Sequence, residues 1–203
     1  ACANGGTQRH YMDKEDAASP TASTDAMLLT AVIDAQEERD VMTADIPNAF
    51  CQTEAGSTKD GERIVMKVRG RLVEMLVEID PDTYADFVVY ENGVKTLCLH
   101  VIMAIYGMLQ SSLLFYKKCR KDIESIGFVV NPYDPCVANR MINSKQHTVA
   151  WHVDDLKASH VQYEVNTKFA AWLDKTYGDE KIGRVKAVRG KIHDFLGMTL
   201  DYT

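Results

Sequence analysis

The sequence of 203 residues predicts an α+β fold, in which helices pack on one face of an antiparallel sheet. Helical and strand-like patterns follow one another without the regular alternation that builds a parallel sheet. A strong hairpin-turn signal, Asn92-Gly93, separates two strand-like segments. The composition, 46% hydrophobic and 26% charged, is that of an ordinary globular protein, and the length suits one domain or one and a half.

The first expected elements are a helix from Thr24 to Glu38 and a strand from Val41 to Ile46. Asp25 lies in the first turn of the helix, where a negative charge is favourable, and Pro47 ends the strand. The helical period is indicated by apolar residues on one face, which are Leu28, Val32 and Ala35.

The middle of the chain is expected to form a second strand from Ile64 to Val68 and a helix from Arg71 to Ile79. The Asn92-Gly93 signal then joins strands from Phe87 to Tyr90 and from Val94 to His100.

The second half is expected to hold two helices, Ser112 to Ile126 and Val161 to Tyr177. Each is followed by a residue that favours helix termination, Gly127 or Gly178. Short apolar runs predict strands at Phe128 to Val130, Cys136 to Ile142, Thr148 to Val153, Leu156 to His160, Arg184 to Val188 and Asp194 to Asp201.

The net charge is −6, and it is unevenly distributed. Residues 1–94 carry 18 acids and 8 bases, a net of −10, whereas residues 95–203 carry 11 acids and 15 bases, a net of +4. The acidic balance argues against a nucleic-acid partner, but the five bases within residues 181–191 could still face phosphates. No apolar run is long enough to span a membrane, no signal peptide is visible, and the start at Ala1 suggests a fragment of a longer product.

The cysteines favour reduced intracellular thiols over a disulfide framework or a zinc ribbon. There are five of them, an odd number, and they are widely spaced without a Cys-x-x-Cys pair. They are Cys2, Cys51, Cys98, Cys119 and Cys136.

Three carboxylates are candidates for chemistry. Asp45 ends an expected strand, and Asp154 and Asp155 lie between two others. Carboxylates that converge at a tight turn repel one another unless a cation neutralises them, and Mg²⁺ prefers oxygen ligands. Two such ions are the clamp of phosphoryl-transfer enzymes. The alternative is that these residues are ordinary turn or capping aspartates.

Several segments together resemble the reverse transcriptase domain of Ty1/copia-type LTR retrotransposons. They occur in the family's order over residues 18 to 200, nearly the whole chain. The segments are SPTASTDAMLLTAVIDA, ADIPNAF, AIYGMLQSSLLFYKK, SIGFVVNPYDPCVANR, HVDDLKAS and DFLGMTL.

The resemblance implies the fingers and palm of a right-hand polymerase, with an antiparallel palm sheet backed by helices and without the thumb. The fingers would comprise residues 1–40 and 52–110, and the palm residues 41–51 and 111–203.

The resemblance also implies an RNA-directed and DNA-directed DNA polymerase that adds dNTPs to a primer 3′-hydroxyl by two-metal catalysis. Asp45 and Asp154 would bind both Mg²⁺ ions, Asp155 would support them, and Ile46 would adjoin the metal site. Mn²⁺ could substitute for Mg²⁺.

The nucleotide site implied by the resemblance contains Phe50, which would exclude a 2′-hydroxyl, and its neighbour Ala49. Tyr106, Gly107 and Gln110 would lie near the nascent base pair, and Gly107 would permit close backbone approach. A core role for Phe50 and a structural role for Tyr106 are the alternatives.

The primer grip is implied at Phe195, Leu196 and Gly197, for which a plain apolar hairpin is the alternative. The bases that could contact phosphate are Arg9, Lys186, Arg189 and Lys191.

The implied partners are an RNA or DNA template with a DNA primer, and the implied location is cytoplasmic, in intracellular retroelement particles. The oligomeric state is left open. A second hypothesis is a catalytically weak or inactive truncated fragment that retains the fold and only binds nucleic acid. A third, another palm-type enzyme such as a nucleotidyl cyclase, lacks the glycine-rich acidic loop typical of that class.

Overall fold

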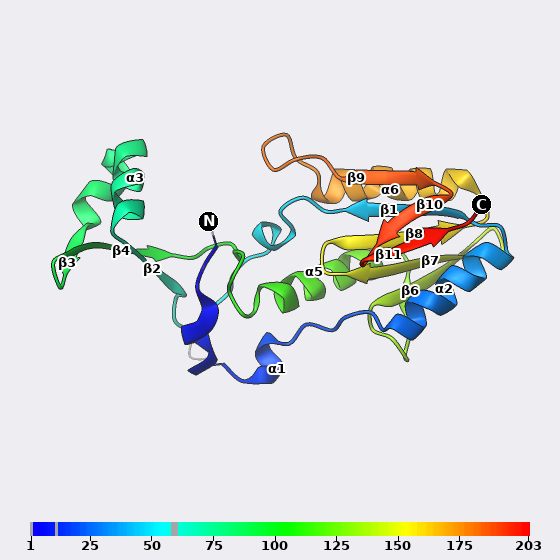
Figure 1. Cartoon of the computed structure of the whole chain (residues 1–203), viewed down its shortest axis with the longest axis horizontal. Coiled ribbons are helices and arrows are strands. Elements are labelled where there is room, and N and C mark those ends of the chain that lie inside the picture. The colour runs from blue at the N-terminus through cyan, green and yellow to red at the C-terminus, as the bar shows by residue number, and fades with distance from the viewer. Residues whose placement is uncertain (1, 11, 58–60) are drawn as a thin grey trace.

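A computed structural model describes residues 2–10, 12–57 and 61–203 of the chain (Figure 1). Its strands form sheets of six, three and two strands, and all the strand pairs in them are antiparallel. Helices pack against these sheets, so the predicted α+β class with antiparallel sheets is confirmed. Among the described residues, no helix is long and apolar enough to cross a membrane.

The helical elements comprise α-helices and short 3₁₀ helices, the latter labelled η. They are η1 (Gly5–His10), α1 (Lys14–Ala17), α2 (Thr24–Gln36), η2 (Ala49–Gln52), α3 (Arg71–Ile79), α4 (Pro81–Tyr84), η3 (Ala85–Phe87), α5 (Ser111–Ser125) and α6 (Tyr163–Tyr177).

The strands are numbered separately, also in chain order. They are β1 (Asp40–Asp45), β2 (Val65–Arg69), β3 (Val89–Glu91), β4 (Val94–His100), β5 (Val129–Val130), β6 (Val137–Ile142), β7 (Lys145–His152), β8 (Asp155–His160), β9 (Lys186–Gly190), β10 (Ile192–Phe195) and β11 (Met198–Asp201).

The six-stranded sheet has the order β5-β6-β7-β8-β1-β9. Strands β6, β7 and β8 are joined by short turns, whereas β1, which comes first in the chain, lies between β8 and β9. The strand that ends at Asp45 therefore has a neighbour on each side.

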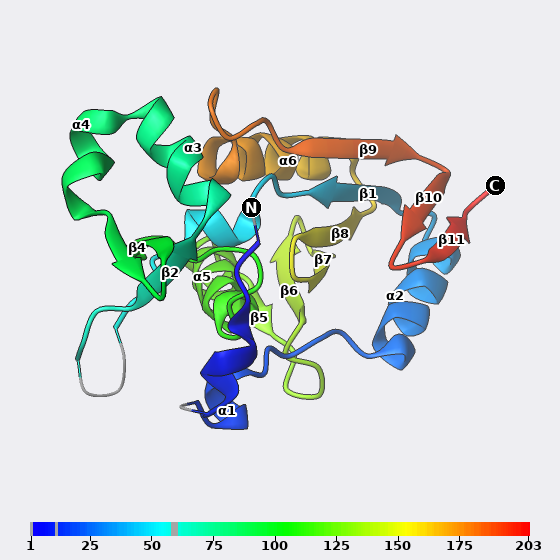
Figure 2. The ribbon, with the colours of Figure 1, turned by 60° about the vertical axis from the view of Figure 1, so that its left-hand side comes forward.

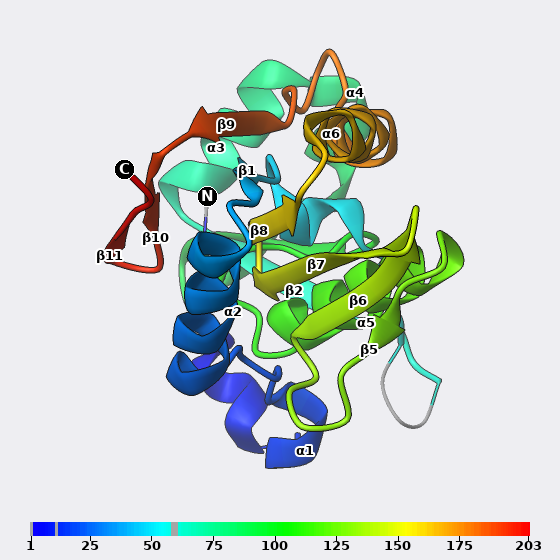
Figure 3. The ribbon, with the colours of Figure 1, turned by 90° about the vertical axis from the view of Figure 1, so that its right-hand side faces the viewer.

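Helices α5 and α6 cover one face of this sheet and bury the main core against it (Figure 3). Large residues of both helices are almost fully buried, since their relative exposure is 2% or less. They are Phe115, Cys119, Ile123, Phe169, Leu173 and Tyr177.

Helix α2 and the β10–β11 hairpin lie on the opposite face, which corrects the prediction that the helices pack on one face only. A second core cluster joins Met27 of α2 and Phe195 of β10 to the sheet residue Ala150. Leu28 and Val32, which were expected to lie on the apolar face of the helix, are 50% and 60% exposed. Apolar residues are distributed around α2, and its buried residues are Met27, Thr30 and Asp34, so the apolar pattern did not identify the buried side.

The three-stranded sheet β2-β4-β3 forms a separate unit with α3 and α4 (Figures 1 and 2). Asn92 and Gly93 join β3 to β4, and both have positive φ, 50° and 76°. This conformation is that of a two-residue primed turn, so the hairpin signal in the sequence is confirmed.

The C-terminal strands differ from the expected ones. The single strand predicted from Asp194 to Asp201 is a hairpin, because Leu196 and Gly197 both have positive φ and reverse the chain. The preceding strand begins at Lys186 and ends at Gly190, two residues later than predicted.

Candidate active site

The carboxylates predicted from the sequence lie at one end of the six-stranded sheet. Asp45 is the last residue of β1, and its direct partner on β8 is Asp155. On its other side, Asp45 is the direct partner of Lys186 on β9. Directly opposed residues of antiparallel strands point to the same face, so two acids and one base stand side by side across three strands.

Asp154 lies in the two-residue turn between β7 and β8, together with Val153. Its carbonyl oxygen accepts a hydrogen bond from the backbone N–H of Ile46 at 3.0 Å, which ties the turn to the end of β1. Val153 has a φ of 57°, a conformation that is costly for a β-branched residue. Such strain is concentrated at functional sites, where it is maintained by the surrounding structure.

The electrostatics show that these carboxylates interact. The pKa of Asp155 is raised, first by burial and then by the negative charges of Asp154 and Asp45. A cation placed among the three would relieve this repulsion and favour the ionised form of Asp155.

The donors at this end of the sheet suit a hard divalent cation, because two neighbouring strands and the turn before one of them offer three carboxylates as oxygen ligands. Within the described part of the chain, however, no group of three His, Cys, Asp or Glu side chains is already arranged to hold a metal ion. The residues fit Mg²⁺ in their chemistry and charge, but their side chains would have to move for direct coordination.

An aromatic pair lies next to the carboxylates. The ring of Phe50, in η2, packs against the ring of Tyr106 with their centroids 4.6 Å apart. The pKa of Tyr106 is raised, mainly by burial, then by Asp154, Cys51 and Asp45, so its hydroxyl is near the acids. Ala49, beside Phe50, is completely buried and fixes the start of η2.

The close approach expected at Gly107 is made by the chain's own N-terminal segment. Gly107 has a φ of 93°, and a Cβ there would lie 1.9 Å from the carbonyl oxygen of Ala3. The N–H of Ala3 also donates to the carbonyl of Tyr106 at 2.7 Å. A glycine is therefore required at position 107 by internal packing.

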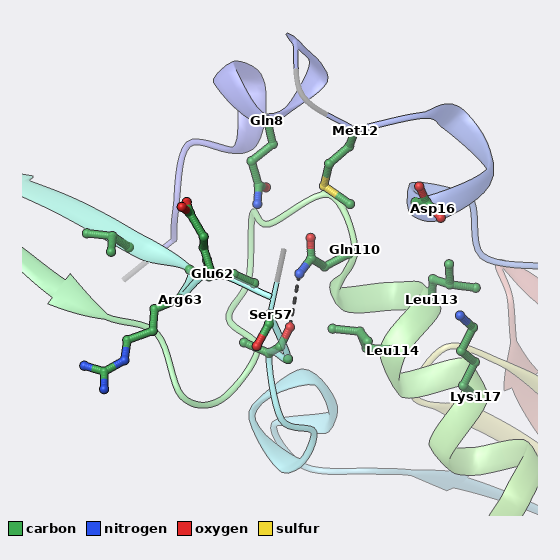
Figure 4. A pocket seen from close by; sticks show the side chains of 14 residues that line it. Gln8, Met12, Asp16, Ser57, Glu62, Arg63, Gln110, Leu113, Leu114 and Lys117 are labelled. Atoms are coloured by element: carbon green, nitrogen blue, oxygen red, sulfur yellow. Dashed lines mark hydrogen bonds between the residues drawn. The ribbon is translucent and has the colours of Figure 1, made fainter. Parts of the chain in front are cut away.

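Gln110 lies on the wall of a cavity of about 680 Å³ (Figure 4). Its amide nitrogen donates to the carbonyl oxygen of Ala55 at 3.1 Å. The cavity lies between the N-terminal segment, the start of β2 and α5, and its described lining includes Gln8, Ser57 and Leu113 but none of the three carboxylates. Gln110 thus faces a cavity that the three carboxylates do not line.

The four candidate phosphate contacts have different surroundings. Arg189 is engaged within the protein, because it pairs with Asp40 and its guanidinium lies 3.9 Å from the ring centre of Tyr163. Arg9, Lys186 and Lys191 are exposed, and of these Lys186 is the direct strand neighbour of Asp45.

The candidate primer grip consists of a buried anchor and a turn. Phe195 is 4% exposed and packs in the core cluster with Met27, so it holds the hairpin in place. Leu196 and Gly197 form the turn, in which Leu196 is partly buried against the same cluster and Gly197 is exposed.

Sequence reasoning missed two polar contacts that support this site. His193 of β10 is buried, and its Nδ1 lies 3.2 Å from the hydroxyl oxygen of Thr43 on β1. Its Nε2 lies 3.0 Å from the carbonyl oxygen of Gly190, which can only accept. Nε2 therefore carries the proton, and Thr43 donates to Nδ1, so the hairpin is hydrogen-bonded to the strand that carries Asp45.

The second missed contact is a buried ion pair between Lys157 of β8 and Asp34 of α2. Both side chains are at most 2% exposed, and Arg39 lies 3.8 Å from the same carboxylate. Burial lowers the pKa of Lys157, and Asp34 opposes that shift. No local pattern predicts this pair, because its members are 123 positions apart.

No family model matches this chain, and no curated protein matches its sequence.

Proposed function

We propose that this chain is the catalytic core of a reverse transcriptase similar to those of Ty1/copia-type retrotransposons, with fingers and palm. It would extend a DNA primer with dNTPs on an RNA or DNA template. The observation that carries the proposal is the grouping of Asp45, Asp154 and Asp155 at one end of an antiparallel sheet, with Lys186 beside Asp45.

Asp45 and Asp154 would hold the divalent cations, and Asp155 would support them from the adjoining position. Bound Mg²⁺, or Mn²⁺ in its place, would activate the primer hydroxyl and stabilise the charge on the leaving pyrophosphate. The backbone bond between Ile46 and Asp154 supports this assignment, because it keeps the turn and the end of β1 together.

Two further side chains would complete the site. Lys186 would donate a proton to, or pair with, the pyrophosphate that leaves near Asp45. Phe50, which is held by its packing against Tyr106, would lie under the incoming sugar and exclude a 2′-hydroxyl.

A chain that binds nucleic acid without catalysis is the second candidate. The observation that favours it is the N-terminal segment on Gly107, because Ala3 occupies the space where a template or nucleotide was expected to approach. The two candidates differ in their response to divalent cations, which catalysis requires and binding does not.

Primer extension tests the proposal. With dTTP and Mg²⁺, the wild-type chain should extend a radiolabelled oligo(dT) primer on poly(rA) and also on poly(dA). Extension should cease in Asp154→Asn and continue in Asp25→Asn, an exposed acid on α2. If wild type and Asp154→Asn bind primer-template equally and neither extends it, the binding-only candidate is correct.

A further inference from the structure

The connection from β2 to β4, residues 70–93, stands away from the carboxylate-bearing sheet (Figure 1). It contains α3, α4, η3 and β3, and we call it the distal lobe. Val73 of the distal lobe packs with Val68 of β2 and Leu97 of β4 in a small cluster that is separate from the cores of the six-stranded sheet. The distal lobe contributes no side chain to the candidate active site.

The surface of the distal lobe is unusually apolar. Of the 21 large apolar side chains that are exposed in the described chain, six fall within the 24 residues of the distal lobe. Phe87 and Tyr90 are each 68% exposed. Scattered apolar residues need no explanation, but such a concentration marks an interaction surface.

Three of these residues form a stripe on α3. Leu72, Met75 and Ile79 have the spacing i, i+3 and i+7, which places them on one side of the helix. Their exposures are 44%, 45% and 77%, whereas Val73 is completely buried. A helix on a protein surface normally turns polar residues to solvent, so α3 has a second apolar side without a partner. At 1.5 Å per residue the stripe is about 10 Å long, enough for about two turns of a partner helix.

The charge of the distal lobe indicates the chemistry of that partner. Two of its acids, Glu74 and Glu91, are neutralised by bases such as Lys95 and Lys67. In the described chain no cation pairs with the remaining acids, which are Glu78, Asp80, Asp82 and Asp86. These negative charges would repel a nucleic acid and attract a basic segment.

We infer that the distal lobe is a docking surface for a basic amphipathic helix of a protein partner. The partner's apolar side chains would cover Leu72, Met75 and Ile79, and its bases would face the unpaired acids. This inference is independent of the proposed polymerase activity, because the distal lobe shares no residue with the candidate active site.

The test uses a fluorescent 16-residue helical peptide with leucines on one side and lysines on the other. Fluorescence anisotropy should detect binding that weakens at least tenfold in Met75→Glu/Ile79→Glu. The matched control, Leu28→Glu/Val32→Glu, changes equally exposed residues of α2 and should alter the affinity less than twofold. Circular dichroism melting curves would verify that both variants fold, which is expected because all four positions are exposed.

The same assay can overturn the inference. If both variants weakened peptide binding equally, the peptide would not select the distal lobe. If the wild type bound a peptide with glutamate in place of lysine as tightly as the lysine peptide, the acids of the lobe would not select a basic partner. If the wild type bound a single-stranded 20-nucleotide RNA and Met75→Glu/Ile79→Glu bound it more weakly, the distal lobe would be a nucleic-acid surface instead. Sedimentation velocity would test for self-association. If the wild type self-associated and Met75→Glu/Ile79→Glu did not, the distal lobe would bind a second copy of this chain.

Discussion

Asp45 and Lys186 are direct partners across β1 and β9, so an acid and a base stand side by side where Asp155 also meets β1. This register brings Lys186, rather than Arg189, next to the candidate active site. Arg189 pairs with Asp40, further from the end of β1.

Replacing Lys186 should slow nucleotide addition. If its ammonium group donates a proton to the pyrophosphate, Lys186→Met should lower the single-turnover rate about a hundredfold. Lys186→Arg should bind primer-template and dNTP nearly as well as the wild type but should remain slow, because arginine keeps the charge but does not release its proton. Lys191→Met is the matched control, and a rate for Lys186→Met equal to the control's would contradict the role.

Replacing Phe50 should relax the selection against ribonucleotides. The packing of Phe50 on Tyr106 fixes the ring beside the carboxylates, so Phe50→Ala removes the surface that a 2′-hydroxyl would meet. The ratio of rUTP to dTTP incorporation in primer extension should rise at least about tenfold. Phe87→Ala, at an exposed residue of the distal lobe, should leave the ratio unchanged. An unchanged ratio in Phe50→Ala would show that Phe50 is only a packing residue.

The buried pair of Lys157 and Asp34 gives a prediction about stability. Lys157→Met leaves the Asp34 carboxylate buried without its closest cation, and it should lower the free energy of unfolding by about 3–5 kcal/mol. Asp34→Leu/Lys157→Met removes both charges and should recover most of that loss. Urea denaturation of both variants measures the difference. A double variant as unstable as the single one would show that packing, and not the unpaired charge, causes the loss.

His147 predicts how stability changes with pH. It is completely buried, and its Nδ1 accepts a hydrogen bond from Arg140 at 3.2 Å, which requires the neutral ring. Burial, followed by the charges of Arg140 and His160, lowers the pKa of His147 to about 3. The unfolded chain takes up this proton near the ordinary pKa of about 6.5, so stability from this residue is lost as the pH falls from about 6.5 towards 3.

The measurement is urea denaturation at pH 7 and at pH 4.5. Between pH 7 and pH 4.5, the free energy of unfolding of the wild type should fall by about 2 kcal/mol more than that of His147→Gln, because glutamine does not titrate. An identical loss in both proteins would assign the acid sensitivity to other groups.

Local patterns allowed much of the fold to be predicted. Asn92-Gly93 fixes a two-residue turn by backbone preference, and the structure has that turn. Glycines at 127 and 178 follow α5 and α6 closely. The grouping of Asp45 with Asp154 and Asp155 was implied by the family resemblance, because local patterns predicted only a strand near Asp45 and, separately, a turn at Asp154.

Contacts between distant segments could not be predicted from those patterns. The sheet and the hairpin that contains Phe195 cover one side of α2, and that side includes the polar residues Thr30 and Asp34 as well as Met27. The apolar pattern of the helix does not predict this choice. The engagement of Arg189 by Asp40 likewise depends on β9 lying beside β1. The sequence therefore predicted three candidate acids but could not choose among the candidate bases.

The most direct test of the central claim is Mg²⁺-dependent extension of oligo(dT) on poly(rA) by the wild type and Asp154→Asn. Binding of primer-template by both proteins would be verified by anisotropy in the same buffer. We expect extension by the wild type only, with a loss of at least about a thousandfold in the variant, because it removes a ligand of the proposed ions. Equal extension by wild type and Asp154→Asn, with Asp25→Asn as control, would contradict the assignment of these carboxylates as the catalytic site.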